Sequence, residues 1–167
     1  MYREILTKAI IAKGNKNIKE NLTFNVNNNV SKVLGCWIIN HKHSVYKEEQ
    51  KIFIKGSCEI NVWYGFDENT KCGLYTFSHS FNDEIPYTFT LEKVYLNEKN
   101  DVKSYVVIEP SCQKMAFSDQ NIIVDIVREY DIDIIGETKL RIKVDDVAID
   151  QMINTNYMKD ASINESN

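Results

Sequence analysis

Apolar and polar residues alternate with a period of two along most of the chain. The pattern recurs in about eight segments that are separated by Asn, Gly, Pro or clusters of charged residues. Such alternation is typical of β-strands with one buried face and one face in water. A sustained helical stripe of apolar residues at i, i+3, i+4 and i+7 is absent from the sequence. We therefore expect an all-β fold: a single antiparallel β-sandwich or barrel-like domain of about eight strands.

The segment KIFIKGSCEINVWYGF, residues 51–66, shows which face of a strand is the core. Its even-numbered positions are mostly apolar, and its odd-numbered positions are mostly polar. Phe53 and Trp63 are the exceptions, because they share the polar face with Lys55, Glu59 and Asn61. Two explanations are open. A second layer covers them, such as residues 14–31 folding over the sheet, or they form a protein–protein interface, where Trp is enriched.

Two stretches interrupt the strand pattern. Residues 14–31, GNKNIKENLTFNVNNNVS, are rich in Asn, so we expect a mobile loop in which LTFNV forms at most a short edge strand. Residues 145–167 are polar and weakly patterned, and we expect a flexible tail that is disordered or a short helix. The predicted β domain therefore covers residues 1–144.

A change of charge sign across Gly136 predicts a hairpin. In residues 121–144 the charged odd positions before Gly136 are all acidic, and Lys139, Arg141 and Lys143 after it are basic. A three-residue loop at 135–137 would pair Asp133 with Lys139, Asp131 with Arg141 and Glu129 with Lys143. The alternative is one long strand with a bulge at the glycine.

Charge and composition exclude several classes of partner. The net charge of -4 is spread over both signs, so we expect neither nucleic acid nor an anionic membrane surface as a partner. The chain shows neither a signal peptide nor an apolar stretch long enough to span a membrane, so we expect synthesis in a reducing cytosol. The four cysteines have no C-x-x-C spacing. We interpret them as small buried hydrophobes, with cross-linking after an oxidising event as the alternative.

Motifs that carry chemistry are missing from the sequence. A nucleophile elbow, a phosphate-binding glycine loop and a zinc-protease motif are all absent, so we expect no enzyme activity and no cofactor. His41 and His43 could share a metal ion with His79 or a cysteine. We favour the simpler interpretation, in which these histidines face water at a strand end and no metal is bound.

Four segments together resemble a known family. They are YREILTKAIIAKG at residues 2–14, GCWIINHK at 35–42, INVWY at 60–64 and GETKLRIKV at 136–144. In order and spacing they are similar to the outer spore coat protein E (CotE) family of endospore-forming bacteria. The matching motif positions are Trp37, Ile38, Ile39, Asn40, His41, Asn61, Trp63 and Tyr64.

The resemblance implies a structural role. A protein of this family is expected to be a morphogenetic protein that is made in the mother-cell cytoplasm and deposited around the forespore. It is also expected to self-associate and to recruit other proteins into the outer coat. The resemblance assigns no chemistry to the matching residues, so we expect them to serve the fold or an interface. Family members carry a long acidic tail linked to partner binding, whereas the last residues here are only mildly acidic. The alternative function is a carbohydrate-binding sandwich that anchors coat or exosporium glycans.

Overall fold

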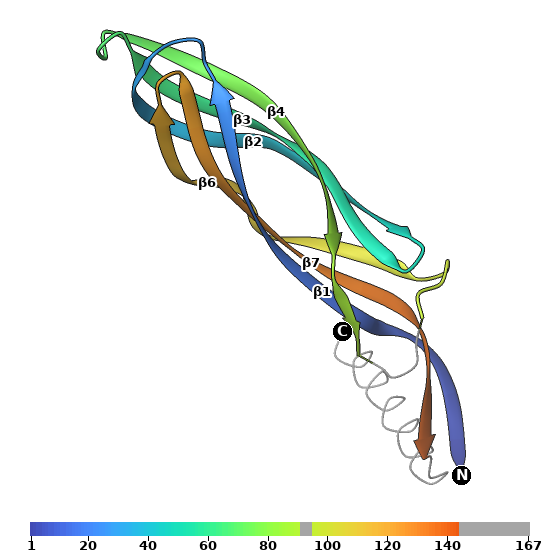
Figure 1. Cartoon of the computed structure of the whole chain (residues 1–167). Helices are drawn as coiled ribbons and strands as arrows, with labels where there is room; N and C mark the ends of the chain where they lie inside the picture. Colours follow the sequence, from blue (N-terminus) through green and yellow to red (C-terminus); the bar gives the residue numbers. More distant parts are fainter. Residues whose placement is uncertain (91–94, 144–167) are drawn as a thin grey trace, which may run out of the picture. The chain divides into compact units, whose positions relative to one another are not determined.

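The computed structural model describes residues 1–90 and 95–143, and all regular elements in these ranges are β-strands. Two antiparallel sheets result, a four-stranded sheet in the order β5-β1-β7-β6 and a three-stranded sheet in the order β2-β3-β4 (Figure 1). The prediction of an all-β fold of antiparallel strands is confirmed, and of the two forms expected, sandwich or barrel, the structure has two separate sheets. The strands are β1 (Tyr2–Asn25), β2 (Val30–Glu48), β3 (Lys51–Phe66), β4 (Lys71–Ile85), β5 (Tyr87–Phe89), β6 (Asp101–Ser118) and β7 (Asn121–Lys143).

The described chain divides into two compact units. The smaller one contains residues 1–9 of β1 and 137–143 of β7, and in it the guanidinium group of Arg141 lies 4.7 Å from the centre of the Tyr2 ring. Ile5 and Leu6 are exposed in this unit. The larger unit, Ile10–Gly136, holds the core and all the sites described below. The predicted tail at residues 145–167 lies outside the described residues, so the boundary near residue 144 stays a prediction.

The core lies on the faces that the alternation predicts. In β3 the even-numbered side chains from Ile52 to Tyr64 are buried, and in β7 the same holds from Ile122 to Ile134. Burial of these apolar side chains is the main favourable term in folding, at about 25 cal/mol per Å² removed from water. The buried members are Ile52, Ile54, Cys58, Ile60, Val62 and Tyr64 in β3, and Ile122, Val124, Ile126, Tyr130, Ile132 and Ile134 in β7.

The prediction of a mobile loop at residues 14–31 is wrong. Residues 14–25 continue β1, and their asparagines face the acidic side chains of β7. The amide of Asn15 donates to Asp131 over 2.6 Å, and the amide of Asn17 donates to Glu129 over 2.8 Å. Asparagine is unfavourable in a strand on average, but cross-strand pairing decides the preference at a given site.

The predicted hairpin at residues 135–137 is also wrong, because β7 runs as one strand through Gly136. The carboxylates of Asp131 and Glu129 pair with the asparagines of β1, and the predicted pairs with Arg141 and Lys143 do not form. Gly136 is needed for close packing: a Cβ atom there would lie 2.6 Å from Nδ2 of Asn100.

Candidate functional site

The outer face of the three-stranded sheet carries the aromatic residues that the sequence singles out. β3 is the central strand of this sheet, and Trp63 pairs with Gly35 on β2 and with Leu74 on β4. Directly paired residues share a face of the sheet. Trp63, Leu74 and the neighbouring outward residues therefore form one surface.

We call Trp37, Ile39, Trp63 and Leu74 the outer patch. Trp63 is 47% exposed and Trp37 is 43% exposed, and Ile39 and Leu74 are exposed as well. Trp37 pairs with Asn61, which lies two residues before Trp63 on β3, so the two tryptophans are diagonal neighbours. Single exposed apolar residues are ordinary on a protein surface, but a contiguous group of four with two tryptophans is typical of a binding surface.

Asn61 lies beneath the outer patch and is only 5% exposed. Its side-chain oxygen accepts a hydrogen bond from the Thr76 hydroxyl over 3.0 Å. Its amide nitrogen is buried and has no partner among the described residues. A buried polar group that lacks a hydrogen bond costs about 1–3 kcal/mol, so such groups call for an explanation.

Phe53 lies toward the other end of the outer face and already has a partner. Its ring stacks on the Tyr46 ring of β2, with the ring centres 5.2 Å apart. The proposed cover of Phe53 and Trp63 by residues 14–31 is wrong, because residues 14–25 belong to β1 in the four-stranded sheet. Trp63 is therefore the more exposed of the two predicted interface residues.

A β-bulge at Asn40 turns His41 into the interior. Ile39 pairs with Glu59 and Lys42 with Ser57, so Asn40 and His41 together oppose one residue of β3. Asn40 has φ 55°, a left-handed conformation that Asn tolerates better than most residues. The bulge adds one residue and shifts the alternation by one position. Between Gly35 and Ile39 the odd positions of β2 point outward, and after the bulge the odd positions point inward.

His41 links β2 to both β6 and β7. Its Nδ1 atom lies 2.8 Å from the Glu109 carboxylate, and its Nε2 atom lies 2.7 Å from the Tyr130 hydroxyl. The His43 ring stacks on it, and burial followed by the charge of His41 lowers the pKa of His43. The prediction that these histidines face water at a strand end is wrong. Burial raises the pKa of the Tyr130 phenol, and the Tyr130 side chain is fully buried.

The arrangement does not bring the three histidines to one metal site. Both ring nitrogens of His41 are hydrogen-bonded, and Nε2 of His79 lies 2.5 Å from the Glu20 carboxylate instead. Within residues 1–90 and 95–143, no group of three or more His, Cys, Asp or Glu side chains could hold a metal ion.

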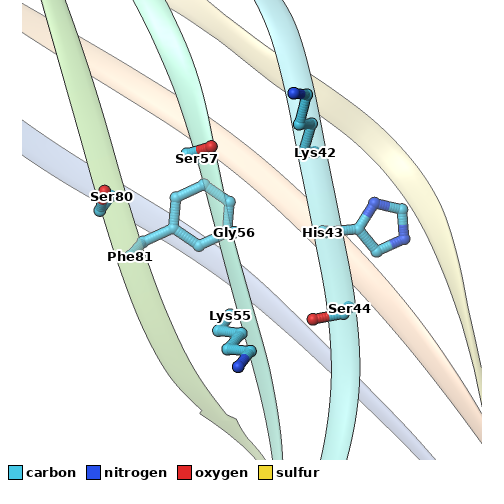
Figure 2. Close-up of a pocket in the computed structure, with 8 residues that line it drawn as sticks. All are labelled: Lys42, His43, Ser44, Lys55, Gly56, Ser57, Ser80 and Phe81. Carbon is cyan, nitrogen blue, oxygen red and sulfur yellow. The ribbon is translucent and has the colours of Figure 1, made fainter.

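Two shallow hollows lie on the outer face. One of about 550 Å³ is lined by residues of all three strands, with the Phe81 ring beside Gly56 (Figure 2). A Cβ atom on Gly56 would lie 2.7 Å from that ring, so Phe81 occupies the space that a side chain would fill. The second hollow, of about 470 Å³, contains Asn40 and Thr76, neighbours of the outer patch. Its other lining residues are Lys42, Ser57, Cys58, Glu59 and Ser78.

A buried ionic cluster lies between the sheets. Arg128 of β7 is 1% exposed; it donates two-pronged hydrogen bonds of 3.0–3.1 Å to Asp83 of β4 and one of 2.8 Å to Glu20 of β1. Its guanidinium group also lies 4.0 Å from the centre of the Phe81 ring. The cluster therefore ties β1, β4 and β7 together across the core.

We expect Glu20 to make stability depend on pH in acid. Burial alone would raise the pKa of Glu20, but the hydrogen bonds and charges of Arg128 and His79 outweigh it and leave this pKa below the ordinary value of 4.5. Glu20 therefore stabilises the fold above about pH 4.5, and the contribution is lost as the pH falls through the folded-state pKa. Urea unfolding between about pH 7 and pH 3 should show a weaker pH dependence for Glu20→Gln than for the wild type. Equal slopes would contradict this role.

The comparisons with known proteins identify the family. The family described as outer spore coat protein E (CotE) matches residues 1–167. The chain belongs to the CotE family. No curated protein and no solved structure matches the chain. Within the described ranges, no helix is long and apolar enough to cross a membrane.

In this CotE-family protein the predicted motif residues occupy different places. Trp37 lies in the outer patch, Asn61 lies beneath it, and Asn40 and His41 form the bulge. Tyr64 is a core residue whose hydroxyl accepts a hydrogen bond from Asn28 over 3.2 Å. The motif therefore contains exposed residues of the outer patch together with buried residues and bulge residues that belong to the underlying sheet.

Sequence reasoning missed Leu74 and the ionic cluster, although a signal for both is present. Leu74 occupies an outward position of β4, directly opposite Trp63. Arg128, Asp83 and Glu20 each fall on the inner face of their strands by parity, among apolar neighbours. Charged residues at core positions are rarely buried unless they are paired, so three of them on inner faces predict a mutual contact.

Proposed function

We propose that this protein is a structural component of the outer spore coat that self-associates, and that the outer patch is the surface through which it binds a second copy of itself. In the full proposal it is made in the mother cell, is deposited around the forespore and then recruits other coat proteins. Membership of the CotE family supports the coat role. The observation that carries the assembly step is the pair of exposed tryptophans, Trp37 and Trp63, on one sheet face.

A second copy is the occupant that fits the outer patch best. In a two-fold contact the same patch lies on both partners, so an apolar surface meets an apolar surface. Trp side chains supply much of the binding energy at the centres of interfaces. The unpaired amide of Asn61 would be able to donate a hydrogen bond to the second copy if the side chains of Trp37 and Trp63 changed rotamer and uncovered it.

The test is Trp63→Ala. We expect a folded β protein whose self-association is about thirtyfold weaker, because truncating an interface hot spot costs roughly 2 kcal/mol or more. Light scattering over a concentration series measures association, and circular dichroism of the same samples measures folding. Phe53→Ala should have a smaller effect, since the Phe53 ring is already stacked on Tyr46.

Tyr105→Ala is the matched control, because Tyr105 is 48% exposed on β6 in the other sheet. It should assemble like the wild type. If Trp63→Ala folds and assembles normally, the docking surface is elsewhere. If it unfolds, Trp63 serves the fold.

A carbohydrate-binding function is the second candidate, favoured by the polar hollow that contains Asn40 and Thr76. Its lining is polar, and Trp37 lies near Asn40 on the same strand, so an aromatic ring and a few polar groups are close together, as in many ligand sites. Calorimetric titration with N-acetylhexosamine oligosaccharides separates the two functions. Saturable binding that Trp37→Ala abolishes, together with a monomer at every concentration, would replace self-assembly by glycan binding.

A further inference from the structure

Two cysteine thiols from different sheets meet at the edge of the core. Cys36 lies on β2, an edge strand of the three-stranded sheet, and Cys112 lies on β6, an edge strand of the four-stranded sheet. Both side chains pack against the core, and β2 and β6 approach each other to within 8 Å between Cα atoms. Each thiol is also among the groups that shift the pKa of the other. Cys36 pairs with Val62 and Cys112 pairs with Ile126, and both of these partners are core residues. The two cysteines therefore point into the space between the sheets.

A second contact fixes how β2 and β6 lie against each other. His41 of β2 bonds to Glu109 of β6 over 2.8 Å. From His41 to Cys36 the numbering of β2 falls, whereas from Glu109 to Cys112 the numbering of β6 rises. This order is the one expected of antiparallel strands, and β2 and β6 contact each other although they belong to different sheets.

We propose that Cys36 and Cys112 form an intramolecular disulfide that joins the two sheets when the protein meets hydrogen peroxide. Both cysteines are free thiols in the structure. Disulfide formation requires Cα atoms within about 7 Å and Cβ atoms that face each other. The contact of β2 with β6 within 8 Å, and the inward direction of both cysteines, favour that geometry. The inference does not depend on the proposed self-assembly.

The oxidation balances with peroxide as the two-electron acceptor. The Cys112 thiolate attacks one peroxide oxygen and becomes a sulfenic acid, and the departing hydroxide takes up a proton to leave as water. The Cys36 sulfur then attacks the Cys112 sulfur, the S–S bond forms, and a second water leaves with the remaining proton. Two thiols and one peroxide thus give one disulfide and two waters.

Burial sets which thiol reacts first and how fast. Burial, followed by the hydrogen bond and charge of Cys112, raises the pKa of Cys36 to about 12. Burial also raises the pKa of Cys112, but a hydrogen bond from Cys36 opposes that rise. Cys112 is therefore the first nucleophile. The rate of cross-linking should rise about tenfold per pH unit near neutral pH, because the reactive thiolate is the minor form there.

The experiment uses the full chain with Cys72→Ser, because Cys72 is exposed and would join chains to each other. The protein is treated with hydrogen peroxide in native buffer, alkylated and digested with trypsin without reduction. We expect the peptides 33–42 and 104–114 to appear as one disulfide-linked species and to separate after reduction. Closing so long a loop should raise the melting temperature by on the order of 10 °C, reversibly on reduction.

Matched variants make the result decisive. Cys36→Ser and Cys112→Ser should each lose both the linked species and the rise in melting temperature, whereas Cys58→Ser should keep both. The proposal fails if native protein gives no link between 33–42 and 104–114 under peroxide that fully oxidises Cys72 of the unmodified chain. It also fails if the link forms only in urea, or only between two chains.

Discussion

Replacing Arg128 with Met should lower the free energy of unfolding by about 3–5 kcal/mol, the usual cost of removing one partner of a buried ion pair. The Arg128 side chain is almost completely buried, and it supplies the hydrogen bonds that satisfy Asp83 and one oxygen of Glu20. Methionine fills part of the volume but leaves both carboxylates in the core without their cation. Urea unfolding monitored by circular dichroism measures the loss.

Two further substitutions separate charge from geometry. Arg128→Lys keeps the charge but cannot make the two-pronged bond to Asp83, so it should lose less stability than Arg128→Met. Arg3→Met removes an exposed guanidinium group and should change stability by less than about 0.5 kcal/mol. If Arg128→Met were as stable as the wild type, the cluster would contribute nothing net to folding.

Phe81→Ala should cost about 3–5 kcal/mol, the range for truncating a buried aromatic side chain. The Phe81 ring fills the space beside Gly56 and lies against the guanidinium group of Arg128. Truncation leaves a cavity that Gly56 cannot fill, and it removes the attraction between the ring and the cation. Thermal and urea unfolding measure this effect.

Phe53→Ala is the control for the loss of a phenyl ring. Phe53 lies on the outer face against Tyr46 and is only half-buried, so its truncation should cost clearly less. Phe81→Leu, which refills part of the cavity, should fall between Phe81→Ala and the wild type. A loss for Phe81→Ala no larger than that for Phe53→Ala would show that the site collapses around the missing ring.

The sequence predicts well which side chains of a strand are buried, because buried and exposed residues occupy alternate positions. In β3, alternation identifies the core face and leaves Trp63 on the outer face, where the structure has it. The rule works because side chains of a strand alternate between faces without exception until a bulge intervenes. Asn40 marks one of the register shifts in β2, and its left-handed φ angle has no clear signal in a run of ordinary residues.

Strand pairing is the part that alternation could not supply. The sign change across Gly136 suggested a local hairpin, but the acidic residues of β7 bond to asparagines more than a hundred residues earlier in the chain. Charge pattern within one segment cannot distinguish these partners, because an exposed ion pair and an exposed amide–carboxylate bond differ by only about 1 kcal/mol. For the same reason, the contact between β2 and β6 could not be predicted from the sequence.

The strand order also determines when this protein can finish folding during synthesis. The sheet β2-β3-β4 joins consecutive strands and can form early, as local contacts do. β1 has to wait for β7, and Asn21 meets Asp125 only after 104 further residues have been made. Until then the apolar inner face of the early sheet lacks most of its cover. A nascent chain in that state exposes apolar surface and an unpaired strand edge, which favour premature association until β7 is made.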